Sequence, residues 1–130
     1  MMVAFIKRLT SHIAIPIAWT LMTIILLCLP GSAFPGGGLF ELPNLDKVVH
    51  IILFGGIVVF WSVYYLGKNV VNTNWRFTVI IIALLTIALG ICMEFIQFNY
   101  IPHRSFDIGD IIANTITAII FAAFFYFRKP

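Results

Sequence analysis

The segment FTVIIIALLTIALGICMEFIQF, residues 77–98, is an apolar run of 22 residues in which Glu94 carries the only charge. At about 1.5 Å per residue, a helix of this length measures roughly 33 Å, enough to cross a bilayer core about 30 Å thick. Lipid offers no hydrogen-bond partners to a bare backbone, so a segment that crosses it must be helical. The segment therefore predicts a transmembrane helix.

Three further apolar runs of 17 to 19 residues have the same character, at 13–29, 48–66 and 111–127. Hydrophobic residues make up 62% of the 130 residues and charged residues 10%, and the mean hydropathy is +1.06. A soluble domain carries roughly 25% charged residues, so this chain lacks the charge to coat a globule in water. No repeat or linker divides the sequence. We therefore expect one all-α domain, residues 1–130, a polytopic bundle of four transmembrane helices.

The first run allows a second interpretation. Lys7 and Arg8, the run at 13–29 and the small residues 31–33 together resemble a cleavable signal peptide. The apolar core of a signal peptide has about 7–15 residues, and this run is longer. A retained helix is the preferred interpretation, and N-terminal sequencing distinguishes the two.

The basic residues indicate an orientation. Six of the eight flank one set of run ends, where no acidic residue occurs: Lys7, Arg8, Lys68, Arg76, Arg128 and Lys129. The other ends carry only Lys47, expected to be a solvated interfacial cation, and Arg104. Because cytoplasmic loops are enriched in Lys and Arg, both termini are predicted to be cytoplasmic. The basic residues form no run or stripe, so the net charge of +3 does not indicate nucleic-acid binding.

Polar side chains gather at the ends opposite to those six basic residues. Within each segment they are three or four residues apart, a spacing that places them on one helix face. They are Asp46 and His50; Glu94 and Gln97; and Asp107, Asp110 and Asn114, with Arg104 in the short loop before the last group. If the last three helices pack together, these side chains form one polar pocket at the outer ends of the bundle.

Structural roles can account for some members of this group. Asp46, Asp107 or Asp110 can cap a helix N-terminus, and Gln97 and Asn114 can hydrogen-bond between helices. Glu94 is harder to explain in this way, because it lies inside an apolar run. Charges within spans are costly and usually face a polar cavity or partner.

The residue types suggest binding and proton transfer. His50 suits a general acid or base oriented by Asp46 one turn earlier, and the planar fork of Arg104 suits a phosphate or carboxylate. Ser105 is only a weak candidate nucleophile. We assign catalytic roles to His50, Glu94 and Asp110, and substrate-binding roles to Asp46, Gln97, Arg104, Asp107 and Asn114.

A divalent cation is a variant of the same hypothesis. Hard or borderline cations accept carboxylate and imidazole ligands, which Asp46, His50, Glu94, Asp107 and Asp110 can supply. The sequence has no compact metal motif such as HExxH. The cofactor is therefore left open.

Three blocks in this order resemble the VanZ-like membrane protein family: Asp46-Lys47-x-x-His50, Glu94-x-x-Gln97 and Arg104-Ser105-x-Asp107-x-x-Asp110-x-x-x-Asn114. The resemblance covers about residues 46–127. Thr117 departs from the family, in which a glycine often follows the asparagine, and this leaves the local helix packing open. The resemblance implies a multi-pass protein of the bacterial cytoplasmic membrane. The family takes its name from an association with teicoplanin resistance, and its biochemical activity is poorly defined.

Three classes of function stay open. The polar pocket could bind, and also modify, an envelope lipid, a lipid-linked precursor or a glycopeptide-related ligand. It could instead only hold the helices together in a non-enzymatic structural or interaction protein. A transporter or proton path is disfavoured, because the cytoplasmic half of every run is almost purely apolar. The sequence does not decide whether a reaction is catalysed, nor the oligomeric state.

Overall fold

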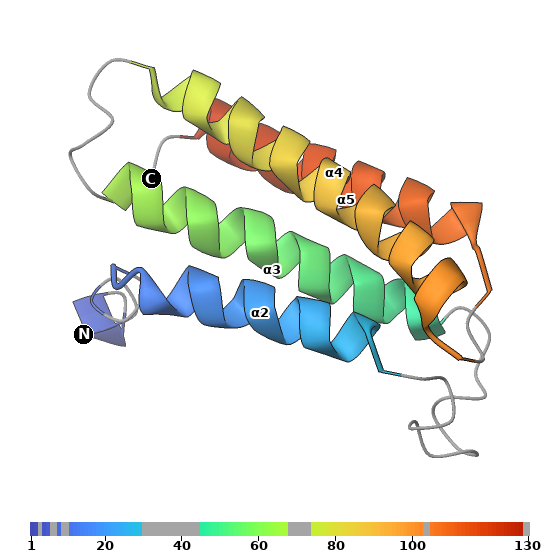
Figure 1. Ribbon diagram of the computed structural model, residues 1–130. Helices are drawn as coiled ribbons and strands as arrows, with labels where there is room; N and C mark the ends of the chain where they lie inside the picture. The colour runs from blue at the N-terminus through green and yellow to red at the C-terminus, as the bar shows by residue number, and fades with distance from the viewer. Residues whose placement is uncertain are drawn as a thin grey trace.

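A computed structural model describes residues 11–29, 45–67, 74–102 and 105–128, together with residues 1, 2, 4, 5 and 8. Four helices occur in this part of the chain: α2 (Ala14–Leu27), α3 (Leu45–Gly67), α4 (Trp75–Tyr100) and α5 (Ile108–Phe127). Successive helices run in opposite directions along one bundle, so α3 and α5 begin where α2 and α4 end (Figure 1). The prediction of an all-α fold is confirmed for the described residues.

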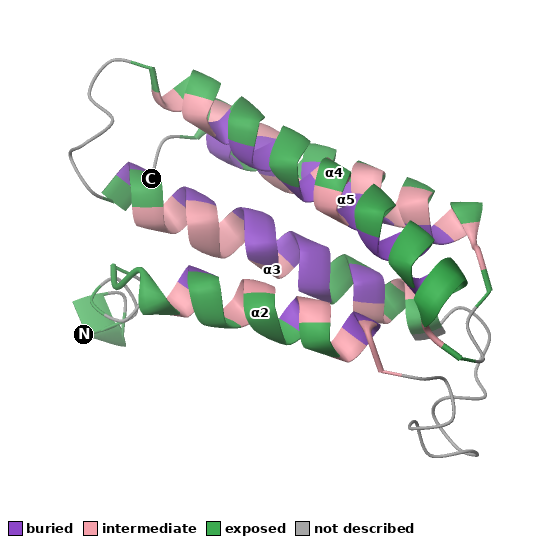
Figure 2. Ribbon diagram, viewed as in Figure 1, coloured by how far each residue is buried: buried purple, intermediate pink, exposed green. Residues whose placement is uncertain are grey.

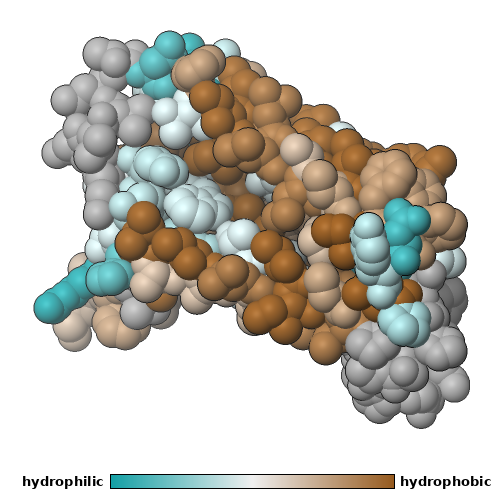
Figure 3. Space-filling view, viewed as in Figure 1, coloured by the Kyte–Doolittle hydropathy of each residue, from teal (hydrophilic) through white to brown (hydrophobic). Residues whose placement is uncertain are grey.

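Three of these helices, α3, α4 and α5, are long and apolar enough to cross a membrane. Their outer faces are exposed and the faces they turn to one another are buried (Figure 2). The space-filling view shows a hydrophobic middle with hydrophilic side chains towards both ends (Figure 3). Helix α2 has 14 residues, about 21 Å, and is shorter than a bilayer core. The fourth span and the cytoplasmic location of the termini stay predictions.

The three long helices extend beyond the predicted apolar runs at the end that holds the polar residues. Helix α3 begins at Leu45 rather than at 48, and α5 begins at Ile108 rather than at 111. Their first turns carry Asp46 and Asp110. Acidic residues are stabilising near a helix N-terminus, so the helices continue past the last apolar residue into polar sequence.

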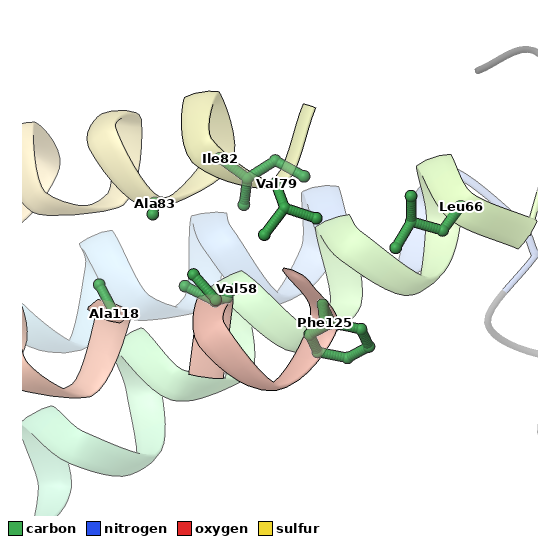
Figure 4. Packing of buried hydrophobic residues seen from close by; sticks show 8 residues of the cluster. Val58, Leu66, Val79, Ile82, Ala83, Ala118 and Phe125 are labelled. Atoms are coloured by element: carbon green, nitrogen blue, oxygen red, sulfur yellow. The ribbon is translucent and has the colours of Figure 1, made fainter. Parts of the chain in front are cut away.

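The core between α3, α4 and α5 combines large and small side chains. Val58, Val79 and Phe125 are buried beside Ala83 and Ala118 (Figure 4). Small residues let membrane helices approach closely. Thr117, which stands where the resemblance led us to expect a glycine, faces a glycine on α3. A Cβ added at that residue, Gly55, would lie 3.3 Å from the Thr117 methyl group.

Helix α2 is joined to α3 through its tryptophan. Trp19 Nε1 donates to the Leu53 carbonyl at 2.8 Å, and its indole packs against Gly56, where an added Cβ would collide with it. Trp61 Nε1 donates in turn to Thr20 Oγ1 at 2.9 Å. The first apolar run is therefore an integrated part of the described bundle.

Candidate functional site

The predicted site residues that the structure describes lie at one end of the bundle, where α3 and α5 begin and α4 ends; we call it the polar end (right in Figure 1). His50, Glu94, Gln97, Asp110 and Asn114 are buried there. The side chains of Asp46, Lys47 and Asp107 are 54%, 31% and 39% exposed. Arg104 lies outside the described residues.

His50 is held between two residues of α5 that are one helical turn apart. Its Nδ1 lies 3.2 Å from Asn114 Oδ1, and its Nε2 lies 3.7 Å from Asp110 Oδ2. Nδ1 can donate to the amide oxygen or accept from the amide nitrogen, so the imidazole tautomer and the Asn114 amide orientation are linked. Asn114 and Asp110, rather than the predicted Asp46, contact the ring nitrogens.

A glycine on α4 makes this arrangement possible. A Cβ added at Gly90 would lie 3.0 Å from Asn114 Nδ2 and 3.2 Å from Asn114 Cβ. The bare glycine backbone lets Asn114 fit between α4 and the imidazole of His50. Sequence reasoning did not single out Gly90, although a glycine four residues before Glu94 in an apolar helix is a packing signal.

Lys47 lies at the centre of three carboxylates. Its Nζ is 3.0 Å from Asp107 Oδ2, 3.6 Å from Asp110 Oδ1 and 3.9 Å from Asp46 Oδ2. Gly109 leaves room for it, because an added Cβ would lie 2.8 Å from Lys47 Cε. Lys47, expected to be a solvated interfacial cation, is instead the counter-ion of carboxylates from the starts of α3 and α5. The excess of acidic residues at this end of the helices is the sequence feature that could have predicted this role.

The same three carboxylates could hold a metal ion, because one oxygen of each lies within 4.8 Å of the others. The Lys47 ammonium already occupies the position beside them that a cation would take. An ion would have to displace Lys47 or share the carboxylates with it. The donor set fits a hard cation, while the arrangement of charges favours the lysine.

Asp107 is both a helix cap and an ion-pair partner. It is the N-cap of α5, and its Oδ1 accepts from the Gly109 N–H at 2.8 Å. The hydrogen bond from Lys47 holds the pKa of the Asp107 carboxyl below its usual value, and the Gly109 N–H acts in the same direction. The capping role proposed for this residue is present, together with a contact between helices.

Glu94 joins the end of α4 to the start of α5. It is 1% exposed, and its Oε1 accepts from the backbone N–H of Asp107 at 2.6 Å. In a capping box the acid at position N3, here Asp110, accepts from that N–H. Because Glu94 accepts from it instead, Asp110 is left to face His50 and Lys47.

Gln97 has a different neighbourhood from its predicted partners. Its Nε2 donates to the Leu27 carbonyl at 2.9 Å. The last carbonyls of a helix have no partner within the helix, and Gln97 satisfies one of those of α2. The contact fits the interhelical alternative, and it brings α2, which has no charged residue, to the edge of the polar end.

The described charges at the polar end are unbalanced. Four carboxylates, Asp46, Glu94, Asp107 and Asp110, face one ammonium, that of Lys47, beside His50. Such a cluster can accept hydrogen bonds from a polar group and can exchange a proton through the imidazole. The other buried polar side chains are hydroxyls, at Thr23, Ser62, Thr86 and Thr117, so among described residues no ionisable relay crosses the bundle.

Comparison of the chain with protein-family models, curated proteins and solved structures gives no match.

Proposed function

We propose that this chain is a multi-pass protein of the bacterial cytoplasmic membrane, related to the VanZ-like family, whose polar end faces outward. It binds the polar group of an envelope lipid, a lipid-linked precursor or a glycopeptide-related ligand. Through that binding it contributes to glycopeptide tolerance. The family and the orientation rest on the three sequence blocks and on the bias of basic residues.

The observation that carries the proposal is the position of His50. The imidazole is 3% exposed and lies between Asn114 and Asp110, next to a cluster that reaches the surface through Lys47 and Asp107. A ligand that contacts the half-buried ammonium of Lys47 and carboxylate of Asp107 is therefore separated from the buried His50 imidazole by the side chain of Asp110. The cluster suits a headgroup that presents hydrogen-bond donors, and the predicted Arg104 supplies a cation for phosphate.

Cohesion alone is a weak reason for such a cluster. Ionisable groups within spans are expensive and usually serve a site or pathway. Replacing a buried ion pair by well-packed apolar side chains is often neutral or stabilising by about 1–4 kcal/mol. Helices that had only to pack together could do so through apolar side chains, such as those of the core cluster around Val58 and Ala118.

The test uses His50→Gln and Asp110→Asn, with Asn99→Gln as the matched control. Asn99 is exposed on the last turn of α4, and its side chain bonds the Phe95 carbonyl of its own helix. The measurements are folded yield after gentle solubilisation, lipids that co-purify, identified by mass spectrometry, and teicoplanin tolerance of a sensitive bacterial host. We expect both site variants to keep their yield and to lose the lipid and the tolerance. Unchanged lipid and tolerance in both would exclude the proposal.

One set of observations favours the structural alternative. Glu94 of α4 and Lys47 of α3 both contact Asp107, the N-cap of α5, and Gln97 of α4 contacts the last residue of α2. If these contacts only hold the bundle together, the site variants lose folded yield, and any protein that remains binds lipid like the control. Yield and lipid binding measured together therefore separate the two functions.

A further inference from the structure

The opposite end of the bundle holds an arginine fixed by two aromatic rings from different helices. The guanidinium carbon of Arg76 lies 5.1 Å from the centre of the Trp75 ring and 5.0 Å from that of the Tyr126 ring. The two rings are themselves 6.4 Å apart, one on α4 and one on α5. We call these three residues the Arg76 clamp.

No carboxylate side chain among the described residues lies near this clamp. The four described acidic residues, Asp46, Glu94, Asp107 and Asp110, are all at the polar end. Arg128, at the end of α5, also rests over a ring, with its guanidinium carbon 5.8 Å from the centre of Phe124. In the described part of the chain, the positive charge at this end has aromatic neighbours and no acidic partner.

The physical properties of the clamp match a lipid phosphate. A guanidinium over a ring face is attracted to it and oriented by it, which leaves its N–H edge available. That planar edge binds phosphate oxygens in a bidentate manner. Tryptophan and tyrosine prefer the headgroup level of a membrane, where such phosphates lie. The exposed Arg76 thus presents ordered donors at the depth of the headgroups.

We propose that the Arg76 clamp binds the headgroup phosphate of an anionic phospholipid such as phosphatidylglycerol. The clamp is far along the bundle from His50 and shares no residue with the polar end, so this inference does not depend on the function proposed above. Binding there would fix the depth and tilt of α4 and α5 in the membrane through one lipid.

The test is lipid selectivity of the full chain reconstituted in phosphatidylcholine vesicles. Electron paramagnetic resonance of spin-labelled phosphatidylglycerol and phosphatidylcholine gives their relative association with the protein. An attraction of about 1 kcal/mol between one basic residue and an anionic headgroup corresponds to about a fivefold preference for phosphatidylglycerol over phosphatidylcholine. We expect Arg76→Gln to remove most of the preference, and Arg8→Gln, which removes the same charge at the same end outside the clamp, to leave most of it.

One further variant and one competitor separate the explanations. Tyr126→Leu keeps the charge and removes one ring, so the preference should fall; an unchanged preference would overturn the clamp even if Arg76→Gln did not fold. Equal losses in Arg76→Gln and Arg8→Gln would show attraction by net charge alone and overturn the site. Displacement of the labelled lipid by inorganic phosphate at constant ionic strength would identify a free anion, rather than a lipid, as the ligand.

Discussion

Replacing Gly90 by alanine tests the packing on which the candidate site depends. The added Cβ would lie 3.0 Å from Asn114 Nδ2 and 3.2 Å from Asn114 Cβ, closer than ordinary contact. Asn114 is 2% exposed and its Oδ1 is 3.2 Å from the buried His50 ring, so a displacement away from Gly90 would disturb that contact. Overpacking costs about 1–3 kcal/mol, and a weakened hydrogen bond in a membrane bundle costs roughly 0.6 more. Alanine regains about 1 kcal/mol of helix propensity, so we expect a net loss of about 1–2 kcal/mol.

The measurement is unfolding in mixed micelles, by titration with a denaturing detergent and far-ultraviolet circular dichroism. Gly67→Ala is the matched control, because no atom lies within 4 Å of a Cβ added there, and we expect it to be as stable as the wild type or more so. In an Asn114→Ala background the amide is gone, and the Gly90→Ala change should cost less. The reasoning is refuted if Gly90→Ala is as stable as Gly67→Ala, or if its cost is the same in both backgrounds.

Three other predictions follow from single contacts. Lys47→Gln empties the position beside three carboxylates, so Ca²⁺ should raise the unfolding midpoint of this variant but not of the wild type; equal shifts would contradict the counter-ion role. Because the pKa of Asp107 is lowered, its stabilising contribution is complete above the usual value of about 3.9 and is lost as pH falls through the folded-state pKa. The loss of stability below about pH 4 should therefore shrink in Asp107→Asn, which can still cap Gly109; an identical acid profile would exclude this role. Trp19→Phe removes the donor to the Leu53 carbonyl and should lower the free energy of unfolding by about 0.5–2 kcal/mol, while N-terminal sequencing should find α2 retained; a mature chain that starts after α2 would refute its place in the bundle.

The sequence was sufficient for the helices and for the end at which polar residues meet. Long apolar runs in a chain with few charges are typical of helices that cross a membrane. The four-residue step from Asp46 to His50 and from Asp110 to Asn114 places each pair on one face, and in the structure both faces turn towards the same cluster. These predictions depend on periodicity within one helix, which a sequence displays directly.

The pairing between helices could not be obtained in the same way. The rotation of α3 against α5 decides whether His50 faces Asn114, and apolar residues on every side of an apolar helix give little indication of that rotation. The contact of Gln97 with the Leu27 carbonyl involves a backbone group, which has no sequence signature. The role of Lys47 was missed for a related reason, because its two nearest carboxylates, those of Asp107 and Asp110, are 60 or more residues away in the sequence.

The Asp107 N–H donates a hydrogen bond to Glu94. This bond is relevant to both alternatives for the polar end, a binding site and a purely structural cluster. It is a structural contact, since it joins the last part of α4 to the N-cap residue of α5. It also positions a residue of the proposed site, because an N3 acid left without competition would accept from that N–H and turn towards its own helix cap. With the N–H already bonded to Glu94, the Asp110 carboxylate instead lies 3.7 Å from His50 and 3.6 Å from Lys47. Removing Glu94 would thus perturb cohesion and proton chemistry together, whereas His50 and Asp110 can be changed without breaking the link between α4 and α5. For this reason variants of His50 and Asp110, rather than of the more deeply buried Glu94, are the ones that can separate binding from cohesion.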